Sequence, residues 1–235
     1  MTQRRAQRPI HLPPQQLKTE DPYRVFDRIN GSHPWQEKVE DGFKLYQTRR
    51  LTECKVIYFN FHLAKQMGLL PQSHSNALNP SLEEKVLDTF ALQIINEYDK
   101  KKGLDLDPNV IKPNKFMATR YLALQHTNKQ GKTSGDGRSI WNGCFTHKGK
   151  AWDISSCGTG VTCFAPGSVE AGEPLKTGNT KFGYGCGTAG LDEMYGSALM
   201  SEVFHHKGIN TERILTIIET IKGQAIGVRA APNLI

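Results

Sequence analysis

The chain has 235 residues, of which 37% are hydrophobic and 23% are charged, and its formal net charge at pH 7 is +7. These values are typical of a soluble globular protein of one large or two small domains, long enough to bury a core without disulfide staples. No run approaches the roughly 18 apolar residues of a membrane span, so we expect neither a membrane partner nor a signal peptide.

The first twenty residues combine Arg4, Arg5 and Arg8 with several prolines, and they predict a disordered basic tail over residues 1–20. Much of the positive charge lies in this tail and in Lys100–Lys102, which favours a solvated surface over a nucleic-acid partner. A nucleic-acid binder is thus an alternative that charge alone supports. Five cysteines without a Cys-x-x-Cys pair disfavour zinc and suit a reducing, cytoplasmic location.

The first elements we expect are a strand over residues 55–60 and a short helix from Phe61 that ends at Gly68. A loop over 71–80 precedes a long amphipathic helix. Ser81 and Glu84 form the pattern of a capping box, the apolar stripe continues to Tyr98, and three lysines and Gly103 close the helix. Residues 104–118 are expected to form another loop, and 121–124 to begin a strand.

The next segment is the most informative: Gly135, Asp136, Gly137 and Arg138 form a turn that opens a β-type run. Strand-like runs over 139–145 and 151–157 flank a turn at 148–150 and predict a hairpin. Two glycines allow a backbone to approach a ligand closely, and an arginine can bind phosphate through two parallel hydrogen bonds. The alternative is a tight hairpin with a solvated arginine.

Residues 158–190 are rich in glycine and are expected to form an extended, poorly packed insertion. A helix should follow from Leu191 to Lys207, with Leu191, Met194, Tyr195, Ala198 and Leu199 facing inward. Glu202 continues this stripe, so it needs a partner unless it lies at an exposed edge. His205 and His206 at the helix end are typical of a surface rather than a metal site.

Two strands, over 212–219 and 224–229, complete the pattern. Hairpin, helix and strand pair together predict an α+β fold of the protein-kinase small-lobe type, an antiparallel sheet packed on helices, with the large lobe absent. We divide the chain into the tail over 1–20, an extension over 21–118 and a nucleotide-binding small lobe over 119–235. The lobe carries a glycine-rich insertion at about 166–184.

A competing motif lies in residues 185–190, where Gly185, Gly187 and Gly190 match the G-x-G-x-x-G pattern before a helix. The buried strand that a dinucleotide-binding fold needs before its first glycine is missing, since residues 181–184 are not of that type. A dinucleotide-binding oxidoreductase is therefore a weaker alternative. A helix N-terminus with glycines could still bind phosphate in another fold.

Taken in order, five blocks resemble the selenoprotein O family of kinase-like proteins, which transfer AMP from ATP to protein hydroxyls. They are residues 55–64, 134–138, 152–160, 199–202 and 208–215. The second is similar to the family's Leu-Gly-Asp-Gly-Arg, and the last two to its Ser-Glu-Ala…Gly-Ile-Pro-Thr-x-Arg-x-Leu. The resemblance implies ATP with Mg²⁺ as cofactors, protein substrates, and AMP attached to Ser, Thr or Tyr.

Carried over residue by residue, the resemblance implies that Gly135, Gly137 and Arg138 contact nucleotide, as do Gly187 in a second glycine run and Arg229 in the last strand. The chain also departs from the family. In this comparison the phosphate-gripping lysine falls on Ser155 and its glutamate partner on Ser197. Cys186 and Thr188 replace the aspartate and arginine of the second run. We hypothesise that Glu193 and Lys176 rebuild the missing ion pair.

The family's catalytic aspartate and Mg²⁺ ligands are expected beyond Ile235, so the resemblance assigns no catalytic residue and no metal ligand to this chain. We therefore expect the N-terminal part of a protein AMP-transferase, inactive as the isolated chain. The alternative is a catalytically degenerate module that binds nucleotide or acts through contacts.

Overall fold

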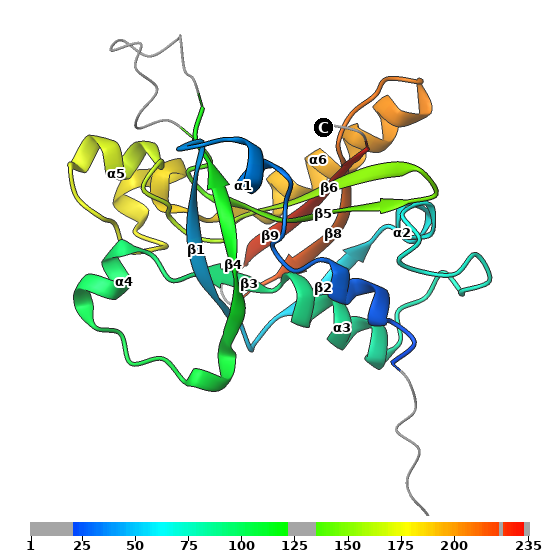
Figure 1. Ribbon diagram of the computed structural model, residues 1–235, viewed down its shortest axis with the longest axis horizontal. Coiled ribbons are helices and arrows are strands. Elements are labelled where there is room, and N and C mark those ends of the chain that lie inside the picture. The colour runs from blue at the N-terminus through cyan, green and yellow to red at the C-terminus, as the bar shows by residue number, and fades with distance from the viewer. Residues whose placement is uncertain (1–20, 122–134, 221–222, 233–235) are drawn as a thin grey trace, which may run out of the picture.

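The computed structural model describes residues 21–121, 135–220 and 223–232 and shows an α+β fold with one large antiparallel sheet and a few helices (Figure 1). The expected fold class is confirmed at this level. The predicted tail over 1–20 and the residues 122–124 lie outside the described residues.

The strands are β1 (Phe43–Arg50), β2 (Lys55–Phe59), β3 (Leu92–Ile94), β4 (Ile111–Thr119), β5 (Ser139–His147), β6 (Lys150–Cys157), β7 (Ala189–Gly190), β8 (Arg213–Glu219) and β9 (Gln224–Pro232). The helices are α1 (Trp35–Lys38), α2 (Phe61–Gln66), α3 (Pro80–Phe90), α4 (Glu97–Lys102), α5 (Pro166–Ala171) and α6 (Leu191–His206), and the 3₁₀ turns are η1 (Arg24–Arg28), η2 (Pro108–Val110) and η3 (Thr180–Cys186).

The sheet has the strand order β2-β8-β9-β6-β5-β4-β1-β3, with β7 added to β9. Every strand pair recorded for the described residues is antiparallel. A single residue pair, Met117 with Trp141, joins β4 to β5 in the register. At this junction β1 and β4 run steeply across the direction of β5 and β6 (Figure 1). The sheet therefore has two parts that meet at a sharp bend.

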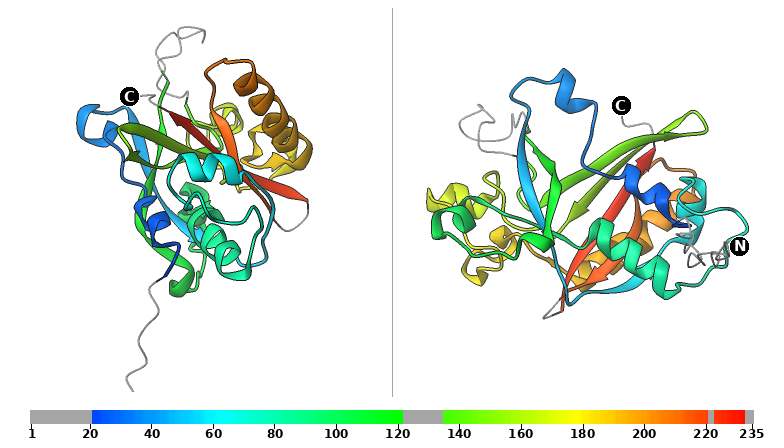
Figure 2. Two further views of the ribbon diagram at one scale, coloured as in Figure 1. Left: turned by 90° about the vertical axis from the view of Figure 1, so that its right-hand side faces the viewer. Right: turned by 60° about the horizontal axis from the view of Figure 1, so that its bottom comes forward.

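In the larger part, β8 is buried on both faces because helices cover both sides (Figure 2). Leu215 and Ile218 pack into the main core with α2 and α3, while Ile214 and Ile217 face Met194 of α6. A strand buried on both faces has a nearly continuous apolar sequence, as residues 214–218 do with Thr216 as the one polar residue. The smaller part, β4-β1-β3, has its own core of Tyr46, Phe116 and Phe164 among others.

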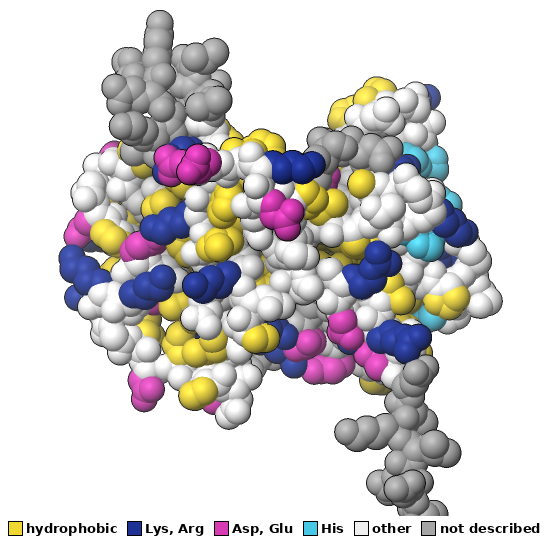
Figure 3. Space-filling model, viewed as in Figure 1, with side chains coloured by type: hydrophobic (Ala, Val, Ile, Leu, Met, Phe, Trp, Pro, Cys, Tyr) yellow, Lys and Arg dark blue, Asp and Glu magenta, His cyan; other side chains and the backbone are white. Residues whose placement is uncertain are grey.

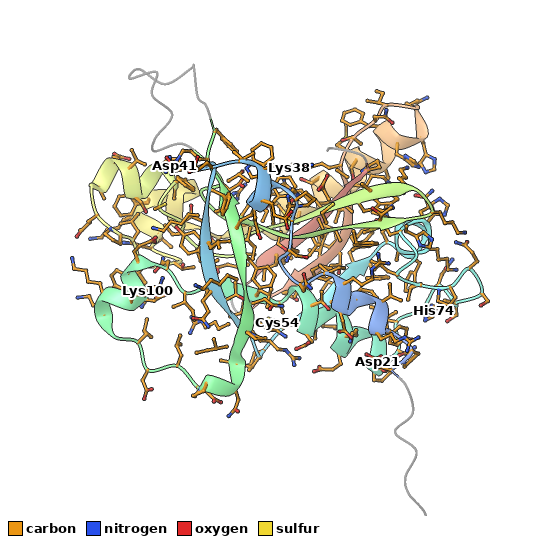
Figure 4. The ribbon with its side chains drawn as sticks, in the orientation of Figure 1. Asp21, Lys38, Asp41, Cys54, His74 and Lys100 are labelled. Carbon is orange, nitrogen blue, oxygen red and sulfur yellow. The ribbon has the colours of Figure 1, made fainter. Side chains whose placement is uncertain are left out.

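The prediction of one long helix from Ser81 to Gly103 is wrong, because this segment forms three elements, α3, β3 and α4. Asn79, not Ser81, caps α3 by accepting a hydrogen bond from the Leu82 N–H at 2.9 Å. Asn96 then forms a capping box with Asp99 and starts α4, which ends at Gly103 in the left-handed region. α4 lies at the periphery, where Figure 4 labels Lys100.

This segment is divided for a tertiary reason: residues 92–94 pair with β1 as strand β3 and so cannot continue the helix. The buried Asn96 amide also donates to the carbonyls of Val161 and Leu175, both at 3.0 Å. These partners lie far away in the sequence, so a local stripe of apolar residues could not reveal them. The same limit explains β4: residues 104–118 were expected to be a loop, but 111–119 pair with β1.

The glycine-rich segment is not poorly packed, contrary to expectation. Val161, Ala165 and Leu175 form a small buried cluster with Phe182 against it, and α5 and η3 give the segment regular structure. Several glycines lie where a side chain would collide with neighbouring backbone; a Cβ on Gly187 would approach Val161 N to 2.2 Å. The glycines thus permit close packing here rather than an open loop.

The expected hairpin, the strand at 55–60, the helix from Leu191 and the final two strands are confirmed. The hairpin turn uses Lys148 and Gly149, both with positive φ. The inward stripe of α6 needs correction: Met194 and Ala198 are buried, but Tyr195 is 47% exposed and Leu199 67% exposed. Among the described residues, no helix has the length and apolar character needed to cross a membrane.

Candidate functional site

The candidate site is a cavity of about 330 Å³ on the α6 side of the larger part of the sheet. Four of the five residues expected to contact nucleotide line it: Gly135, Gly137, Arg138 and Arg229. They come from the turn before β5 and from β9, so the fold brings together groups about ninety residues apart. The other lining residues are Tyr121, Asp136, Ser139, Trp141, Ser155, Cys157, Ala165, Pro166, Gly185 and Glu212.

Asp136, to which the sequence assigned no role, fixes the turn in place. Its carboxylate accepts hydrogen bonds from Thr119 N–H at 2.8 Å, Thr119 hydroxyl at 2.6 Å and Trp141 Nε1 at 3.0 Å, and also from the Tyr121 hydroxyl. The residue is only 9% exposed. Because all these donors belong to β4, β5 and the chain just after β4, Asp136 joins the turn to the sheet at the bend.

The two glycines of the turn have a packing role that the sequence did not indicate. A Cβ on Gly135 would approach the Thr119 carbonyl oxygen to 2.2 Å, and one on Gly137 would approach Ala165 Cα to 2.8 Å. Neither glycine has positive φ. The turn is therefore held tightly between β4 and the segment at 162–166, where Thr162 N–H also donates to the Gly137 carbonyl at 3.0 Å.

Arg138 is the more buried of the two cations of the site and is 8% exposed. Its Nη1 lies 2.9 Å from Glu193 Oε2, and its Nη2 binds Glu193 Oε1, which makes a bidentate pair. The same Nη1 donates to the Thr188 carbonyl at 3.1 Å. Glu193 lies in the first turn of α6, where the helix dipole favours a carboxylate. The guanidinium is thus held in a fixed orientation beside the cavity.

This pair corrects the hypothesis that Glu193 and Lys176 form the ion pair. Glu193 binds Arg138, whereas Lys176 is exposed and lies outside the cavity lining. Ser197, one turn further along α6, does not line the cavity either. Ser155 does line it, and on β6 it pairs in register with Arg229.

Arg229 provides the second cation, less buried than Arg138. Its side chain is 27% exposed, and Nη1 lies 3.0 Å from Glu212 Oε1. Glu212 precedes β8, and it is a site residue that sequence reasoning missed. The antiparallel β8–β9 register, which pairs Ile214 with Arg229, places the two side chains together. Aligning the two predicted strands as an antiparallel pair is the step that could have placed Glu212 beside Arg229.

Gly187 lies outside the cavity lining, which contains Gly185 instead. Its φ of +83° and the collision of a Cβ with Val161 N require glycine for packing. The G-x-G-x-x-G segment follows η3 rather than a strand, and β7 within it pairs antiparallel to β9. The described structure thus lacks the βαβ context that a dinucleotide site of this type needs.

A smaller cavity of about 230 Å³ shares Tyr121 and Trp141 with the candidate site. Its buried floor holds His33, whose Nε2 lies 2.9 Å from Asp153 Oδ1 while Nδ1 accepts from the Trp35 N–H at 3.1 Å. Since Nδ1 accepts this bond, Nε2 is the nitrogen that donates to Asp153. Burial raises the pKa of the nearby Cys144 thiol to about 11, and the negative charge of Asp153 adds to this. Cys144 is therefore a poor nucleophile at neutral pH.

The cavity lining combines two arginines with Asp136 and Glu212, and Glu193 binds Arg138 from outside the lining. Three or more His, Cys, Asp or Glu side chains suitably placed for a metal ion do not occur in the described part of the chain. Lys and Arg side chains are scattered over the face seen in Figure 3, with Asp and Glu between them.

A scan against protein-family models and a search of curated proteins find no match to this chain.

Proposed function

We propose that the chain forms a nucleotide-binding lobe of the protein-kinase small-lobe type and that its cavity binds the phosphates of ATP. The observation that carries the proposal is the convergence of Arg138 and Arg229 with the glycine turn on one cavity. Arginine is the side chain best suited to bidentate contact with phosphate. A volume of about 330 Å³ lies at the lower end for small-molecule sites, which suits part of a nucleotide rather than the whole.

The order of elements supports a kinase-like lobe. Hairpin β5–β6, helix α6 and the pair β8–β9 occur in this order, with α5, η3 and β7 between the hairpin and α6, and the four strands are neighbours in one sheet. In protein kinases a strand lysine paired with a helix glutamate positions the phosphates. In this chain Arg138 of the glycine turn forms an ion pair with Glu193 of α6, the helix that we propose corresponds to the one carrying the kinase glutamate. We assign them the same role.

The carboxylates set a condition on binding. Glu212 neutralises Arg229 through an exposed pair, so an incoming phosphate must displace it or share the guanidinium. Exposed pairs contribute only about 0–1 kcal/mol, so this exchange is inexpensive in free energy. Mg²⁺ bound to the nucleotide phosphates would also neutralise charge beside Glu212 and Asp136. We therefore expect ATP to bind better with Mg²⁺ than without it.

The reaction class proposed is transfer of AMP from ATP to hydroxyls of protein substrates, as in the selenoprotein O family that the sequence resembles. In this proposal, the lobe supplies nucleotide binding and orientation. A second candidate is a regulatory module that binds nucleotide without turnover. The replacement of the family's lysine and glutamate by Ser155 and Ser197 favours it.

The test is a thermal-shift and calorimetric titration with ATP, ADP, AMP and NAD, each with and without Mg²⁺. A ligand at 100 times its dissociation constant stabilises the fold by about 2.7 kcal/mol, which is readily measured. We expect ATP with Mg²⁺ to stabilise the wild type and Arg138→Ala to abolish the effect. Arg50→Ala is the matched control, since Arg50 forms an ion pair with Glu84 away from the cavity.

Absence of any shift with millimolar ATP would refute nucleotide binding, and a selective response to NAD would favour the oxidoreductase alternative. An ATP response that survives in Arg138→Ala would place the nucleotide elsewhere. If ATP binds, incubation with ATP labelled at its α-phosphate and a generic protein acceptor tests for turnover. Label transfer would support the AMP-transferase and contradict the expectation that the isolated chain is inactive, whereas binding without transfer is expected from both candidates.

A further inference from the structure

The outward face of α6 carries an apolar stripe that no described element covers. Leu199 is 67% exposed, Tyr195 47%, Met200 46% and Val203 41%. The opposite face of the same helix packs on the sheet through Met194 and Ala198, as the views in Figure 2 show for the helix as a whole. A helix that is apolar on both faces is normally buried on both faces. The stripe is therefore a surface that needs a partner.

The stripe is symmetric about Leu199. Tyr195 precedes Leu199 by four residues and Val203 follows it by four, so apolar side chains occur at equal distances on each side. Farther out, Asp192 and His206 lie seven residues from Leu199 in opposite directions, about 10 Å along the axis. Both are exposed. Gly196 is exposed, and no atom lies within 4 Å of the position that a Cβ would take there, so another helix can approach closely beside Leu199.

The side chains at the two ends can pair with each other, since one end carries a carboxylate and the other carries imidazoles and a lysine. The first turn contains Asp192, and the last turn contains His205 and His206 with Lys207 directly after it. In an antiparallel pair of α6 helices centred on Leu199, Asp192 of one copy would face His206 of the other. The helix dipoles would also be antiparallel, which is favourable. An identical helix reversed about a two-fold axis meets both the apolar and the charge pattern.

We propose that this face of α6 binds a second copy of the chain and forms a two-fold symmetric dimer with Leu199 at the axis. The interface is self-complementary, with Leu199 against Leu199 and Tyr195 against Val203. One helix pair is small compared with obligate dimer interfaces, so we expect dissociation in the micromolar range. The dimer does not depend on nucleotide binding, since the stripe lies outside the cavity lining.

Sedimentation velocity over a range of concentrations tests the dimer. The wild type should convert from monomer to dimer between about 1 and 100 µM. Leu199→Glu, which places two carboxylates together at the axis, should weaken dimerisation at least tenfold. Leu104→Glu is the matched control, since Leu104 is 44% exposed and lies before β4, away from α6. It should behave as the wild type.

Cysteine cross-linking tests the antiparallel register. Leu199→Cys should form a disulfide with its own copy under mild oxidation, because only a residue near the two-fold axis meets itself. Asp192→Cys alone should not, since its copy would lie about 20 Å away, beyond the roughly 7 Å limit between Cα atoms. The double variant Asp192→Cys/His206→Cys should cross-link. The wild type, treated identically, measures the background from native cysteines.

A wild type that remains monomeric at 100 µM overturns the proposal. So does unchanged dimerisation of Leu199→Glu, or failure of Leu199→Cys to cross-link above background. Cross-linking of Asp192→Cys with itself would indicate a parallel arrangement and would also refute the proposed register. Far-UV circular dichroism of each variant confirms that the fold is retained, which the high exposure of Leu199 leads us to expect.

Discussion

α6 makes two arginine–glutamate pairs, one near each end, and they differ in what surrounds them. Near its C-terminus, Glu202 accepts two hydrogen bonds of 2.8 Å from Arg213 and one of 2.8 Å from the Asn60 amide. Arg213 is 4% exposed, and its third contact is Gln66 Oε1 at 2.8 Å. At the N-terminal end, Glu193 binds Arg138 at the wall of a cavity.

The difference separates a pair that holds elements together from one that the proposed function uses. The Glu202–Arg213 pair joins α6 to α2 and β8, with Arg213 4% and Glu202 26% exposed, and its hydrogen bonds go to neighbouring side chains. A closed network of this kind fixes how α6 sits on the sheet. In the Arg138–Glu193 pair, Arg138 lines a cavity, so a ligand in that cavity would contact Arg138, while Glu193 is 37% exposed. In the proposed function, the same kind of ion pair would thus serve stability at one end of α6 and ligand binding at the other.

The largest expected effect comes from breaking the enclosed pair. Glu202→Gln leaves the buried Arg213 without a counter-charge, so we expect the free energy of unfolding to fall by about 3 kcal/mol. Urea unfolding monitored by circular dichroism measures the loss. A loss below about 1 kcal/mol would show that this pair behaves like a surface one, and the contrast between the ends of α6 would fail.

The same pair should give the protein a sensitivity to acid. Burial by itself raises the pKa of Glu202, but the hydrogen bonds and charge of Arg213 and the Asn60 amide outweigh it and hold the pKa below its ordinary value of 4.5. Since the folded pKa is the lower one, the stabilisation is complete above the unfolded pKa and is lost as pH falls through the folded pKa. The stability difference between wild type and Glu202→Gln should narrow below about pH 4.5. A constant difference down to pH 3 would contradict this.

Arg213→Lys sharpens the comparison with a smaller change. Lysine keeps the positive charge but cannot make the two parallel bonds to Glu202 and the bond to Gln66 together. With two hydrogen bonds lost at about 1 kcal/mol each, we expect a loss of about 2 kcal/mol in urea unfolding. An effect as large as that of Glu202→Gln would mean that geometry, not charge, dominates the pair.

The smallest effect on stability should come from the other end. Glu193→Gln removes the counter-charge of Arg138, but Glu193 is more exposed than Glu202, 37% against 26%, so we expect the free energy of unfolding to fall by about 1 kcal/mol. Nucleotide affinity should fall by about tenfold, because the Arg138 guanidinium loses its fixed orientation. Calorimetry with ATP and Mg²⁺ measures the affinity, with Glu202→Gln as control for general loosening of α6. Unchanged affinity would remove Glu193 from the proposed site.

Periodicity and turn residues predicted the parts of the fold that local sequence controls. The hairpin with Gly149 in its turn, the helix from Leu191 and the last strand pair are confirmed. The requirement of Glu202 for a partner is also confirmed, because a carboxylate on an apolar stripe must be neutralised. The position of Arg138 and Arg229 at one cavity matches the nucleotide turn that the resemblance implied, while ATP binding itself stays a prediction.

The failures share one physical reason, which is pairing between residues distant in the sequence. The helix predicted through Tyr98 is broken because β3 pairs with β1 and Asn96 binds carbonyls of the glycine-rich segment. The partner of Glu193 is Arg138, 55 residues earlier, and no local pattern indicates it. Glu212 reaches the site only through the β8–β9 register.

The sequence by itself thus determined which segments become strands and helices where apolar periodicity and turn residues agree. It also indicated that Glu202 needs an ion-pair or hydrogen-bond partner. Only the tertiary structure decided which arginine each glutamate binds, and that Asp136 joins the turn to the sheet. It also decided which face of α6 the described elements leave uncovered. The reason is that local propensity depends on neighbours in the chain, whereas pairing of buried charges and strands depends on which surfaces the whole fold brings into contact.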